Sequence, residues 1–382
     1  MTTKEREEKL SIYIHIPFCR KKCWYCNFYS VPLREELQRG YLEALCREID
    51  YYARSQLTRG SEIETIYLGG GTPSLLSPKE VDQILNKCSS AFHIALEAEI
   101  TLEANPESLS RQKLIAYQKS GCNRLSLGVQ SFNDHELQLL GRLHTAEQAI
   151  QYYRSAREVG FTNVNVDLMG GIPHQTRRSL LKNLHTLAQL SPDHISFYLL
   201  ELKALCQPAL AEHLPEEKAI ERLYWAAADF LTDLGYQHYE ISNFARPGKA
   251  ARHNLRYWQD EPYLGLGPSA HSYTINSRFW NVSDVEEYIK LIEQQNRAIA
   301  DQEVVTPHRR IEDALILGLR YLPGIELGRF YERYGVNILD RYNQELKSLG
   351  ENSLVETSDD FLRLTRKGIL LSNEVFQQFI SP

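Results

Sequence analysis

The sequence has 382 residues, of which 43% are hydrophobic and 24% are charged, and its formal net charge is −6. This length suggests two or so domains, or one large barrel with an appendage, and the composition is typical of a soluble globular protein. The negative charge argues against a nucleic-acid partner. No uncharged apolar run is long enough to cross a bilayer, and the opening MTTKEREEKL does not resemble a secretory signal. We therefore expect a cytoplasmic protein with reduced thiols.

The most informative segment is residues 11–30, SIYIHIPFCRKKCWYCNFYS. Its first residues alternate between apolar and polar, which predicts a half-buried strand, and Pro17 ends that strand. Cys19, Cys23 and Cys26 follow within a short span, so one loop can point three thiolates at a single centre. An iron–sulfur cluster usually has four thiolate ligands, and three leave one iron with an open position for a small ligand.

Other interpretations of these cysteines stay open at this point. They could form part of a zinc site that His15 or a distant ligand completes. Disulfides are disfavoured because seven cysteines is an odd number and the other four stand singly, as buried structural thiols do. Those four are Cys46, Cys88, Cys122 and Cys206. The spacing alone favours a metal or cluster site.

Strand and helix patterns alternate along the first two thirds of the chain. The alternation predicts a parallel sheet with right-handed crossovers. Six β/α units are too few to close an eight-stranded barrel, so we expect an α/β fold with an open three-quarter (β/α)6 barrel. The predicted strands are residues 12–16, 64–68, 98–103, 124–129, 163–168 and 194–199. The predicted helices are residues 35–58, one capped by Ser77, 109–119, one around Leu137, 146–159, 177–189 and 216–234.

Polar residues stand at the carboxyl ends of these strands, where β/α barrels bind their ligands. Glu103, Gln130 and Asp167 lie at or near strand ends, and Arg142 lies in a following loop. Each alone could be a helix cap or a loop residue. Their occurrence at the edge that also carries the cysteine loop favours a binding site.

Three glycines follow the second predicted strand, in the sequence GGGTP at residues 69–73. Successive glycines let backbone N–H groups approach a ligand closely. A flexible strand-to-helix turn is the alternative, and it would be preferred for three glycines in isolation.

Residues 239–273 are dense in Tyr, Trp, His, Asn and Gly and show little helical periodicity. This pattern predicts a long ordered loop that lines a site. The loop contains His253, Asn254, Tyr257 and Trp258 within HNLRYW. A histidine can bind a metal and aromatic rings offer flat apolar faces, and a porphyrin needs both. From the residues alone, an aromatic cluster that packs the open side of the barrel is preferred.

The C-terminal part, residues 306–382, has a different pattern of predicted elements. We predict helices at residues 310–321, 327–334, 339–349 and 367–379, and a hairpin of residues 353–356 and 361–364, an order that resembles a winged-helix module. The helix containing DRYNQELKSLG has no basic stripe, so we expect a lid or interaction domain. The predicted organisation is a barrel core at 1–240, an aromatic-rich connecting segment at 241–305, and a small α+β winged-helix-like domain at 306–382.

The cysteine spacing CxxxCxxC after the first strand resembles the radical S-adenosylmethionine (SAM) superfamily. The wider pattern YIHIPFC followed by CWYCNF resembles the oxygen-independent coproporphyrinogen III oxidases and their relatives, the HemW heme chaperones. The resemblance implies that Cys19, Cys23 and Cys26 hold a [4Fe-4S] cluster whose fourth iron takes the amino and carboxylate groups of SAM. The family has sites for two SAM molecules. The implied SAM contacts are Tyr13, Tyr25, Gly70, Gly71, Thr72, Glu103, Gln130, Arg142 and Asp167.

Three features favour the chaperones over the oxidases. The oxidases resemble CxxxCxxCxC, and this chain has Phe28 at the fourth cysteine position. The oxidases carry a long N-terminal extension, whereas about a dozen residues precede the first strand here, too few to cover a site. The third feature is HNxxYW, flanked by EISNFARPG and YLGLGPSAHS, which matches the HemW group. There it is associated with heme binding, which implies heme contacts from His253, Asn254, Tyr257 and Trp258.

The resemblance thus implies a heme chaperone that binds heme, a [4Fe-4S] cluster and SAM. Heme would be its cargo, a heme-acceptor protein its partner, and peripheral contact with membrane-bound hemoproteins would be compatible with that role. The alternative is an oxygen-independent coproporphyrinogen III oxidase, which uses SAM to decarboxylate propionate side chains. A zinc-stabilised binding protein without a redox role is a third reading. Intact SAM motifs leave both enzymatic and non-enzymatic roles open.

Overall fold

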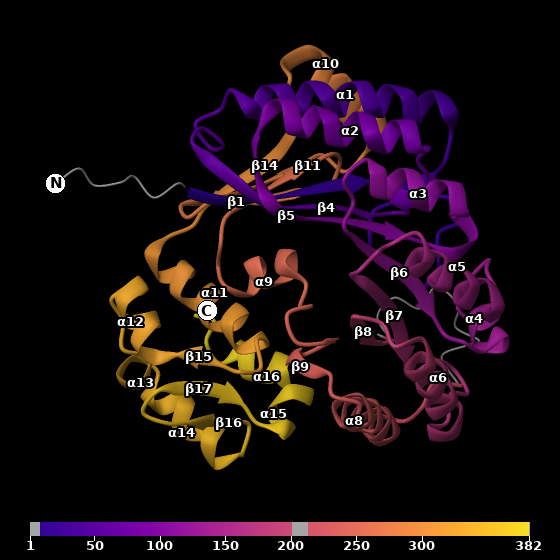
Figure 1. Ribbon diagram of the computed structural model, residues 1–382. Coiled ribbons are helices and arrows are strands. Elements are labelled where there is room, and N and C mark those ends of the chain that lie inside the picture. Colours follow the sequence, from indigo (N-terminus) through magenta and orange to yellow (C-terminus); the bar gives the residue numbers. More distant parts are fainter. Residues whose placement is uncertain (1–7, 201–212, 382) are drawn as a thin grey trace.

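The computed structural model describes residues 8–200 and 213–381. Six strands form the centre of a curved sheet, and each pairs in parallel with the next along the chain (Figure 1). This confirms the predicted (β/α)6 barrel. The strands are β1 (Glu8–Ile16), β4 (Ser61–Gly70), β5 (His93–Ala104), β6 (Arg124–Gln130), β7 (Val164–Gly170) and β8 (His194–Leu199).

Helices cover the outer face of this sheet, as a parallel sheet requires (Figure 1). Ser or Thr side chains cap three of them with capping boxes, at Ser77, Thr145 and Thr176. The helix predicted for residues 35–58 ends early, at Ala53. The helices are α1 (Glu35–Ala53), α2 (Pro78–Ala91), α3 (Arg111–Lys119), α4 (Asp134–Leu139), α5 (Ala146–Glu158), α6 (Arg177–Leu190) and α8 (Glu217–Asp233), with short 3-10 turns η1 (Pro73–Leu75) and η2 (Pro106–Ser108).

The two faces of the barrel wall differ in polarity. Ile12, Ile14 and Ile16 of β1 are fully buried in the main hydrophobic cluster. The alternate residues of the same strand, Tyr13 and His15, hydrogen-bond to each other at 3.1 Å. Because strand side chains alternate between faces, the strands place apolar residues under the helices and polar residues inside the barrel.

The prediction of a long loop at residues 239–273 is wrong, because this segment forms four short strands and a helix. The strands have three or four residues and are mostly buried, so they show no clear alternation to read from the sequence. The elements are β9 (Gln237–Glu240), β10 (Asn243–Ala245), α9 (Arg252–Trp258), β11 (Tyr263–Leu266) and β12 (His271–Tyr273).

These strands lengthen the sheet at both ends. β11 pairs in parallel with β1, and β12, β13 (Ser277–Asn281) and β14 (Ile299–Val304) follow in antiparallel pairs, with α10 (Val285–Gln295) between the last two. At the other end β10 pairs with β8 and then with β9. The order is β14-β13-β12-β11-β1-β4-β5-β6-β7-β8-β10-β9, so the barrel stays open between β14 and β9.

The C-terminal part forms its own small core around Leu315, Leu319 and Leu362. Its order of helices and a hairpin agrees with the prediction, but two predicted helices are each split, at Tyr342 and at Leu371. The elements are α11 (Pro307–Arg320), β15 (Ile325–Glu326), α12 (Leu327–Tyr334), α13 (Ile338–Arg341), α14 (Asn343–Glu351), β16 (Val355–Thr357), β17 (Phe361–Leu364), α15 (Arg366–Leu370) and α16 (Ser372–Gln377).

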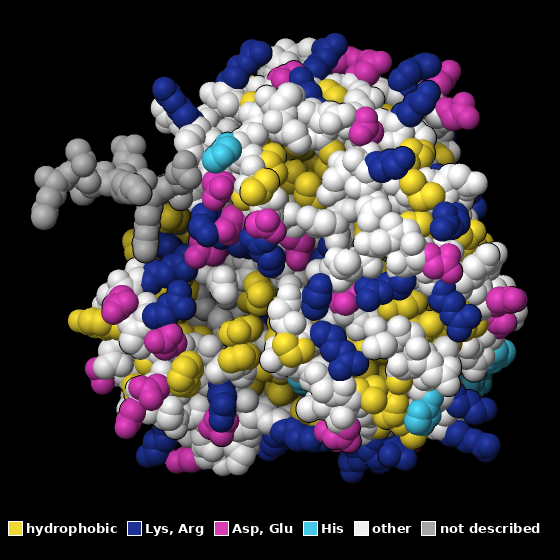
Figure 2. Space-filling view, viewed as in Figure 1, with side chains coloured by type: hydrophobic (Ala, Val, Ile, Leu, Met, Phe, Trp, Pro, Cys, Tyr) yellow, Lys and Arg dark blue, Asp and Glu magenta, His cyan; other side chains and the backbone are white. Residues whose placement is uncertain are grey.

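Acidic and basic side chains are interspersed over the face shown in Figure 2, without a large area of one sign. In the described parts of the chain, no helix has the length and apolar character that crossing a membrane demands.

A buried carboxylate fixes the joint between the barrel and its added strands. Glu48 of α1 is fully buried and accepts hydrogen bonds from the Gly267 N–H at 2.8 Å, the Asn281 amide at 2.6 Å and the Tyr288 hydroxyl at 2.7 Å. Burial raises the pKa of Glu48, and the three donors oppose that rise. The carboxylate thereby ties α1 to the turn after β11, to β13 and to α10.

We expect Glu48→Ala to lower the free energy of unfolding by about 3 kcal/mol, because three buried donors lose their acceptor. Urea unfolding followed by circular dichroism measures this loss. Glu43→Ala is the matched control, since Glu43 is an exposed residue of the same helix. Equal stability of the two variants would show that the network contributes little.

Candidate functional site

The cysteine loop is closed at its base. Two short strands, β2 (Phe18–Cys19) and β3 (Val31–Pro32), pair in parallel on either side of it. The buried ring of His15, at the end of β1, hydrogen-bonds through Nε2 to the Tyr29 carbonyl at 2.9 Å. These contacts fix the position of the cysteine loop relative to β1.

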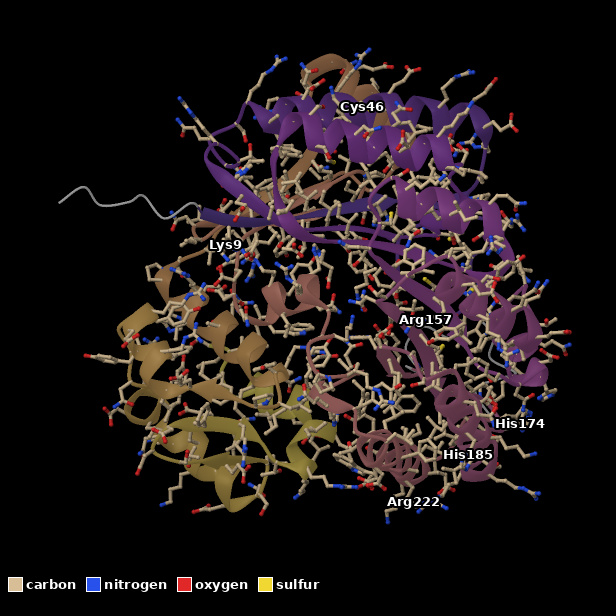
Figure 3. All side chains as sticks on the ribbon, in the orientation of Figure 1. Lys9, Cys46, Arg157, His174, His185 and Arg222 are labelled. Carbon is tan, nitrogen blue, oxygen red and sulfur yellow. The ribbon has the colours of Figure 1, made fainter. Side chains whose placement is uncertain are left out.

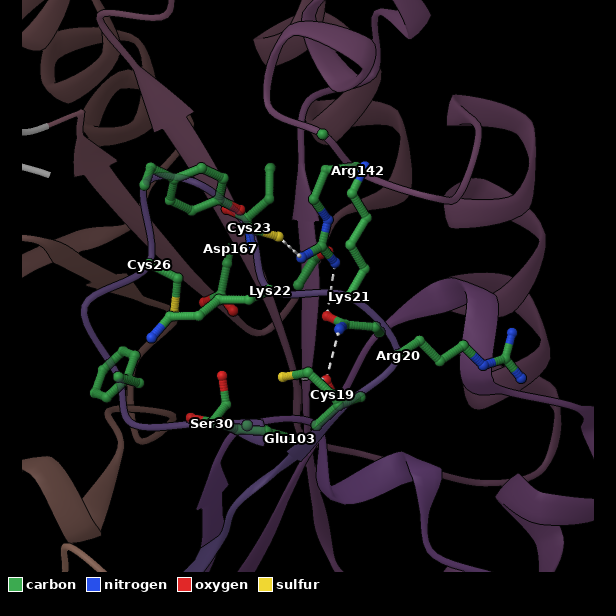
Figure 4. A pocket seen from close by; sticks show the side chains of 18 of the residues that line it. Cys19, Arg20, Lys21, Lys22, Cys23, Cys26, Ser30, Glu103, Arg142 and Asp167 are labelled. Atoms are coloured by element: carbon green, nitrogen blue, oxygen red, sulfur yellow. Dashed lines mark hydrogen bonds between the residues drawn. The ribbon is translucent and has the colours of Figure 1, made fainter. Parts of the chain in front are cut away.

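A cavity of about 460 Å³ lies beneath this loop, at the carboxyl ends of the barrel strands. Its size is typical of a small-molecule site. Figure 4 shows Cys19, Cys23 and Cys26 pointing into one common space. The structure also brings the predicted SAM contacts to this cavity, with the exception of Tyr13. Those that line it are Tyr25, Gly70, Gly71, Thr72, Glu103, Gln130, Arg142 and Asp167.

Tyr13 lies deeper in the barrel. Its ring stacks on Tyr67, with centroids 6.2 Å apart, and its hydroxyl is bonded to His15. Tyr67 in turn donates a hydrogen bond to Glu103 at 2.7 Å. Tyr13 therefore reaches the cavity only through neighbouring side chains.

The glycine turn packs directly against the cysteine loop. Gly71 and Thr72 donate their N–H groups to main-chain carbonyls at the end of β1 and at Phe18, each at 2.8 Å, and Gly70 donates to Glu103 at 3.2 Å. A Cβ atom on Gly71 would lie 2.7 Å from the Phe18 carbonyl oxygen. The expectation that these N–H groups face a ligand is therefore wrong. The glycines are needed for close backbone packing.

Arg142 places a cation beside the cysteines. Its guanidinium donates to the Cys23 sulfur at 3.7 Å and to the Asn105 side chain at 2.6 Å. Burial opposes its charge, but Tyr25, Glu107 and Cys23 raise the pKa of Arg142, so it stays protonated. The guanidinium therefore holds a fixed positive charge in contact with the Cys23 sulfur.

Asn105 is a site residue that the sequence reasoning missed. Besides meeting Arg142, its amide donates to the Thr72 hydroxyl at 3.1 Å, and that hydroxyl lies 3.5 Å from the Cys19 sulfur. The sequence analysis treated Asn105 only as a strand breaker. The available signal was its position two residues after Glu103, which places both side chains on one face of an extended chain.

Two carboxyl groups, those of Glu103 and Asp167, line the cavity. Burial raises the pKa of Glu103 to about 7, and the nearby Asp167 adds to that rise. Burial also raises the pKa of Asp167. Between them in the sheet, Gln130 has a left-handed backbone with φ of 68° beside a register shift. Such strain in a non-glycine residue is typical of functional sites.

The donor set fits an iron–sulfur cluster. Three soft thiol ligands come from one loop and surround a cavity with room for another ligand. Among the described residues, no three His, Cys, Asp or Glu side chains gather closely enough to hold a single metal ion, so the zinc alternative lacks a preformed site there. Cys46 lies on the outer helix layer (Figure 3), and Cys88 and Cys122 are buried. Cys206 lies outside the described residues.

The HNxxYW residues are separate from this cavity. They lie on α9, within the space that the sheet curves around (Figure 1). His253 is 1% exposed, and its ring is bonded to the Thr65 hydroxyl at 2.7 Å and to the Tyr257 hydroxyl at 2.8 Å. Burial lowers the pKa of His253 to about 3. The imidazole is neutral with both nitrogens engaged, while Asn254 and Trp258 are half-buried.

Tyr257 and Trp258 border a second cavity of about 350 Å³, to which Leu317 of α11 also contributes. The guanidinium of Arg320 lies over the Trp258 ring, 4.6 Å from its centroid. Nearby, the buried Asp260 accepts a hydrogen bond from Tyr334 of α12 at 2.9 Å. The C-terminal domain therefore packs directly on the segment that carries HNxxYW.

Comparisons with known proteins agree with this architecture. Residues 13–187 match the Radical SAM superfamily and residues 305–371 match the HemN C-terminal domain. The heme chaperone HemW of Bacillus subtilis is 36% identical over 97% of this chain and 99% of that protein. HemW of Escherichia coli is 38% identical over 69% of each chain. A bovine relative, radical S-adenosyl methionine domain-containing protein 1, mitochondrial, is 33% identical over 98% of this chain and 88% of its own length.

Among solved structures, the coproporphyrinogen III oxidase HemN of Escherichia coli, a radical SAM enzyme, superposes with a TM-score of 0.85 at 27% identity. The match covers 98% of this chain and 90% of HemN. The fold is thus shared with the oxidase along nearly the whole chain. The higher sequence identity to full-length chaperones decides between the two branches. The chain belongs to the HemW heme chaperone family of the radical SAM superfamily.

Proposed function

We propose that this protein is a heme chaperone that binds heme, a [4Fe-4S] cluster and SAM, and passes heme to an acceptor protein. The observation that carries the proposal is that three cysteines and every expected SAM contact except Tyr13 border one cavity. It is supported by relatives that are themselves named heme chaperones. The proposal places the protein in the cytoplasm, where thiols stay reduced.

Cys19, Cys23 and Cys26 would hold the cluster. When bound, the cluster supplies an electron for reductive cleavage of SAM. Thr72 and Arg142, which are bonded to the Cys19 and Cys23 sulfurs, keep these two thiols oriented toward the cavity. The carboxyl oxygens of Glu103 and Asp167 offer acceptors for the hydroxyl and amino donors of SAM.

The heme contacts are proposed on α9, at His253, Asn254, Tyr257 and Trp258. Because both nitrogens of His253 are engaged, binding heme iron through this ring requires it to release Tyr257 or Thr65. The faces of Tyr257 and Trp258 border the second cavity and suit an apolar macrocycle. Heme loading therefore includes a local opening of α9.

The second candidate function is coproporphyrinogen III decarboxylation, which the close superposition on HemN favours. Against it, Phe28 stands where the oxidase pattern has a cysteine, and its side chain is 64% exposed at the cavity wall. Incubating reconstituted protein with reductant, SAM and coproporphyrinogen III tests this function. We expect no decarboxylated product, and clear turnover would replace the chaperone proposal.

We expect Cys19→Ala to abolish cluster binding, because two thiolates cannot hold a cubane in this cavity. Anaerobic reconstitution followed by iron analysis and visible absorbance measures the loss. Cys46→Ala is the matched control, since Cys46 lies on the outer helix layer (Figure 3), and should reconstitute like the wild type. Full iron content in Cys19→Ala would refute the assignment.

We expect SAM to bind more tightly as the pH rises from 6 to 8. With a pKa of about 7, Glu103 passes from about one tenth to about nine tenths ionised over this range. The ionised carboxylate accepts the stronger hydrogen bonds. Equilibrium binding of SAM to the reconstituted protein measures how the affinity changes with pH. Glu103→Gln should remove the share of this pH dependence that the Glu103 carboxyl causes. An identical pH profile in Glu103→Gln would exclude Glu103 as a SAM contact.

We expect His253→Ala to weaken heme binding by about tenfold or more, because the variant loses the iron ligand. Titration of heme with detection of the Soret band measures the affinity. His185→Ala is the control, because His185 is an exposed histidine of α6 (Figure 3). Unchanged affinity in His253→Ala would move the axial ligand elsewhere.

A further inference from the structure

A continuous line of hydrogen bonds crosses the barrel from the cysteine cavity to α9. The Asn165 amide donates to Asp167 at 2.7 Å, and its oxygen meets His194 Nδ1 at 2.7 Å. His194 Nε2 meets the Tyr239 hydroxyl at 2.7 Å. That hydroxyl accepts the Ala251 N–H at 3.3 Å, and Ala251 is the residue that precedes α9. The line joins a cavity carboxylate to the start of the HNxxYW helix.

All hydrogen bonds in this line donate in the same direction, toward Asp167. An ionised carboxylate only accepts, so the amide nitrogen of Asn165 faces Asp167 and the amide oxygen faces His194. His194 then donates from Nδ1 and accepts the Tyr239 proton at Nε2. Aligned hydrogen bonds polarise one another in a low-dielectric interior. Charge on Asp167 therefore strengthens each bond as far as Ala251.

The line is sealed from solvent. Asn165 is 1% exposed, His194 0% and Tyr239 5%. The hydroxyls of Ser126 and Ser196, on the two neighbouring strands, also bond to Asn165 at 2.7 and 3.2 Å and fix its orientation. Because water cannot replace a lost partner here, each link depends on its neighbour.

A second carboxylate holds the same end of α9. Glu99 accepts the N–H groups of Arg252 and His253, each at 3.1 Å. Glu99 lies on β5, four residues before Glu103, so both side chains point into the barrel. The strands that carry the cavity carboxylates thus also hold the first turn of α9.

We propose that Asn165, His194 and Tyr239 are positioning residues through which SAM in the cysteine cavity loosens α9 and raises the affinity for heme. This inference rests on the proposed function. Hydrogen-bond donors of SAM that engage Asp167 draw its charge away from Asn165 and weaken the line. A loosened first turn releases His253 more readily from Thr65 and Tyr257. By linkage, heme must tighten SAM binding by the same factor.

Tyr239→Phe tests the line by removing one hydroxyl, which separates His194 from Ala251. Tyr236→Phe is the matched control, because Tyr236 is an equally buried neighbour whose hydroxyl donates to the Pro192 carbonyl at 2.7 Å, outside the line. Heme affinity is measured by Soret titration of the reconstituted full-length protein with and without SAM. We expect SAM to tighten heme binding about fivefold or more in the wild type and in Tyr236→Phe.

Tyr239→Phe should bind heme with the SAM-loaded affinity whether or not SAM is present. A network that served stability alone would lower the unfolding temperature of Tyr239→Phe and leave the effect of SAM intact, which would overturn the inference. His194→Phe breaks the same line, because its ring carries no hydrogen-bonding group, and replaces Tyr239→Phe if that variant does not fold.

Hydrogen exchange of the peptide spanning residues 251–258 provides a readout that needs no heme. SAM should speed exchange there in the wild type and in Tyr236→Phe, and should change nothing in Tyr239→Phe. Equal SAM effects in all three proteins would overturn the inference. Failure of the wild type to bind heme, with the exchange pattern as expected, would overturn the proposed function and leave the SAM-to-α9 link standing.

Discussion

The structure depends on one constraint, which is that much of the polar inner face of its barrel, away from the cysteine cavity, is buried. A buried polar group needs a hydrogen-bond partner within the protein, because it has lost its hydrogen bonds to water and an unpaired group destabilises the fold. The partners come from distant parts of the chain: Tyr67 meets Glu103, His253 meets Thr65, and His194 meets Tyr239. Satisfying these groups fixes how the strands, the cysteine loop and α9 sit relative to one another.

This constraint explains how one framework can serve both an oxidase and a chaperone. Residues 13–187, which match the Radical SAM superfamily, supply the three cysteines and most of the lining of the cavity at the carboxyl edge, and the superposition on HemN covers 98% of this chain. Two of the sequence features that favour the chaperone family are local, namely Phe28 in the cysteine loop and HNxxYW on α9. α9 is bonded to strands β4 and β5, whose carboxyl ends line the cysteine cavity, so the helix and the cavity are positioned by the same strands.

Much of this could be predicted from the sequence, because strong local patterns specify it. The six strands alternate with helices, and the cysteine spacing indicates a metal or cluster site. The strands β9 to β12 were missed because they are short and mostly buried, and two of them join the sheet by pairing with strands further away in the chain, β10 with β8 and β11 with β1. The role of Gly71 was misjudged, since close approach to a ligand and close approach to Phe18 demand the same residue. The burial of His253 depends on Thr65, which no local pattern reveals.

The sheet of the open barrel ends at two outer strands, β14 and β9, and an uncovered edge strand invites pairing with other chains. The outer strand β14 carries Asp301 and Glu303, whose charges discourage a foreign strand. The other edge, at β9, is covered by the chain just after α11, where the Leu322 N–H donates to the Tyr239 carbonyl at 3.0 Å and Tyr321 bridges to Glu240. The C-terminal domain thus also protects against aggregation. A barrel separated from it would expose the unpaired edge of β9 and tend to self-associate.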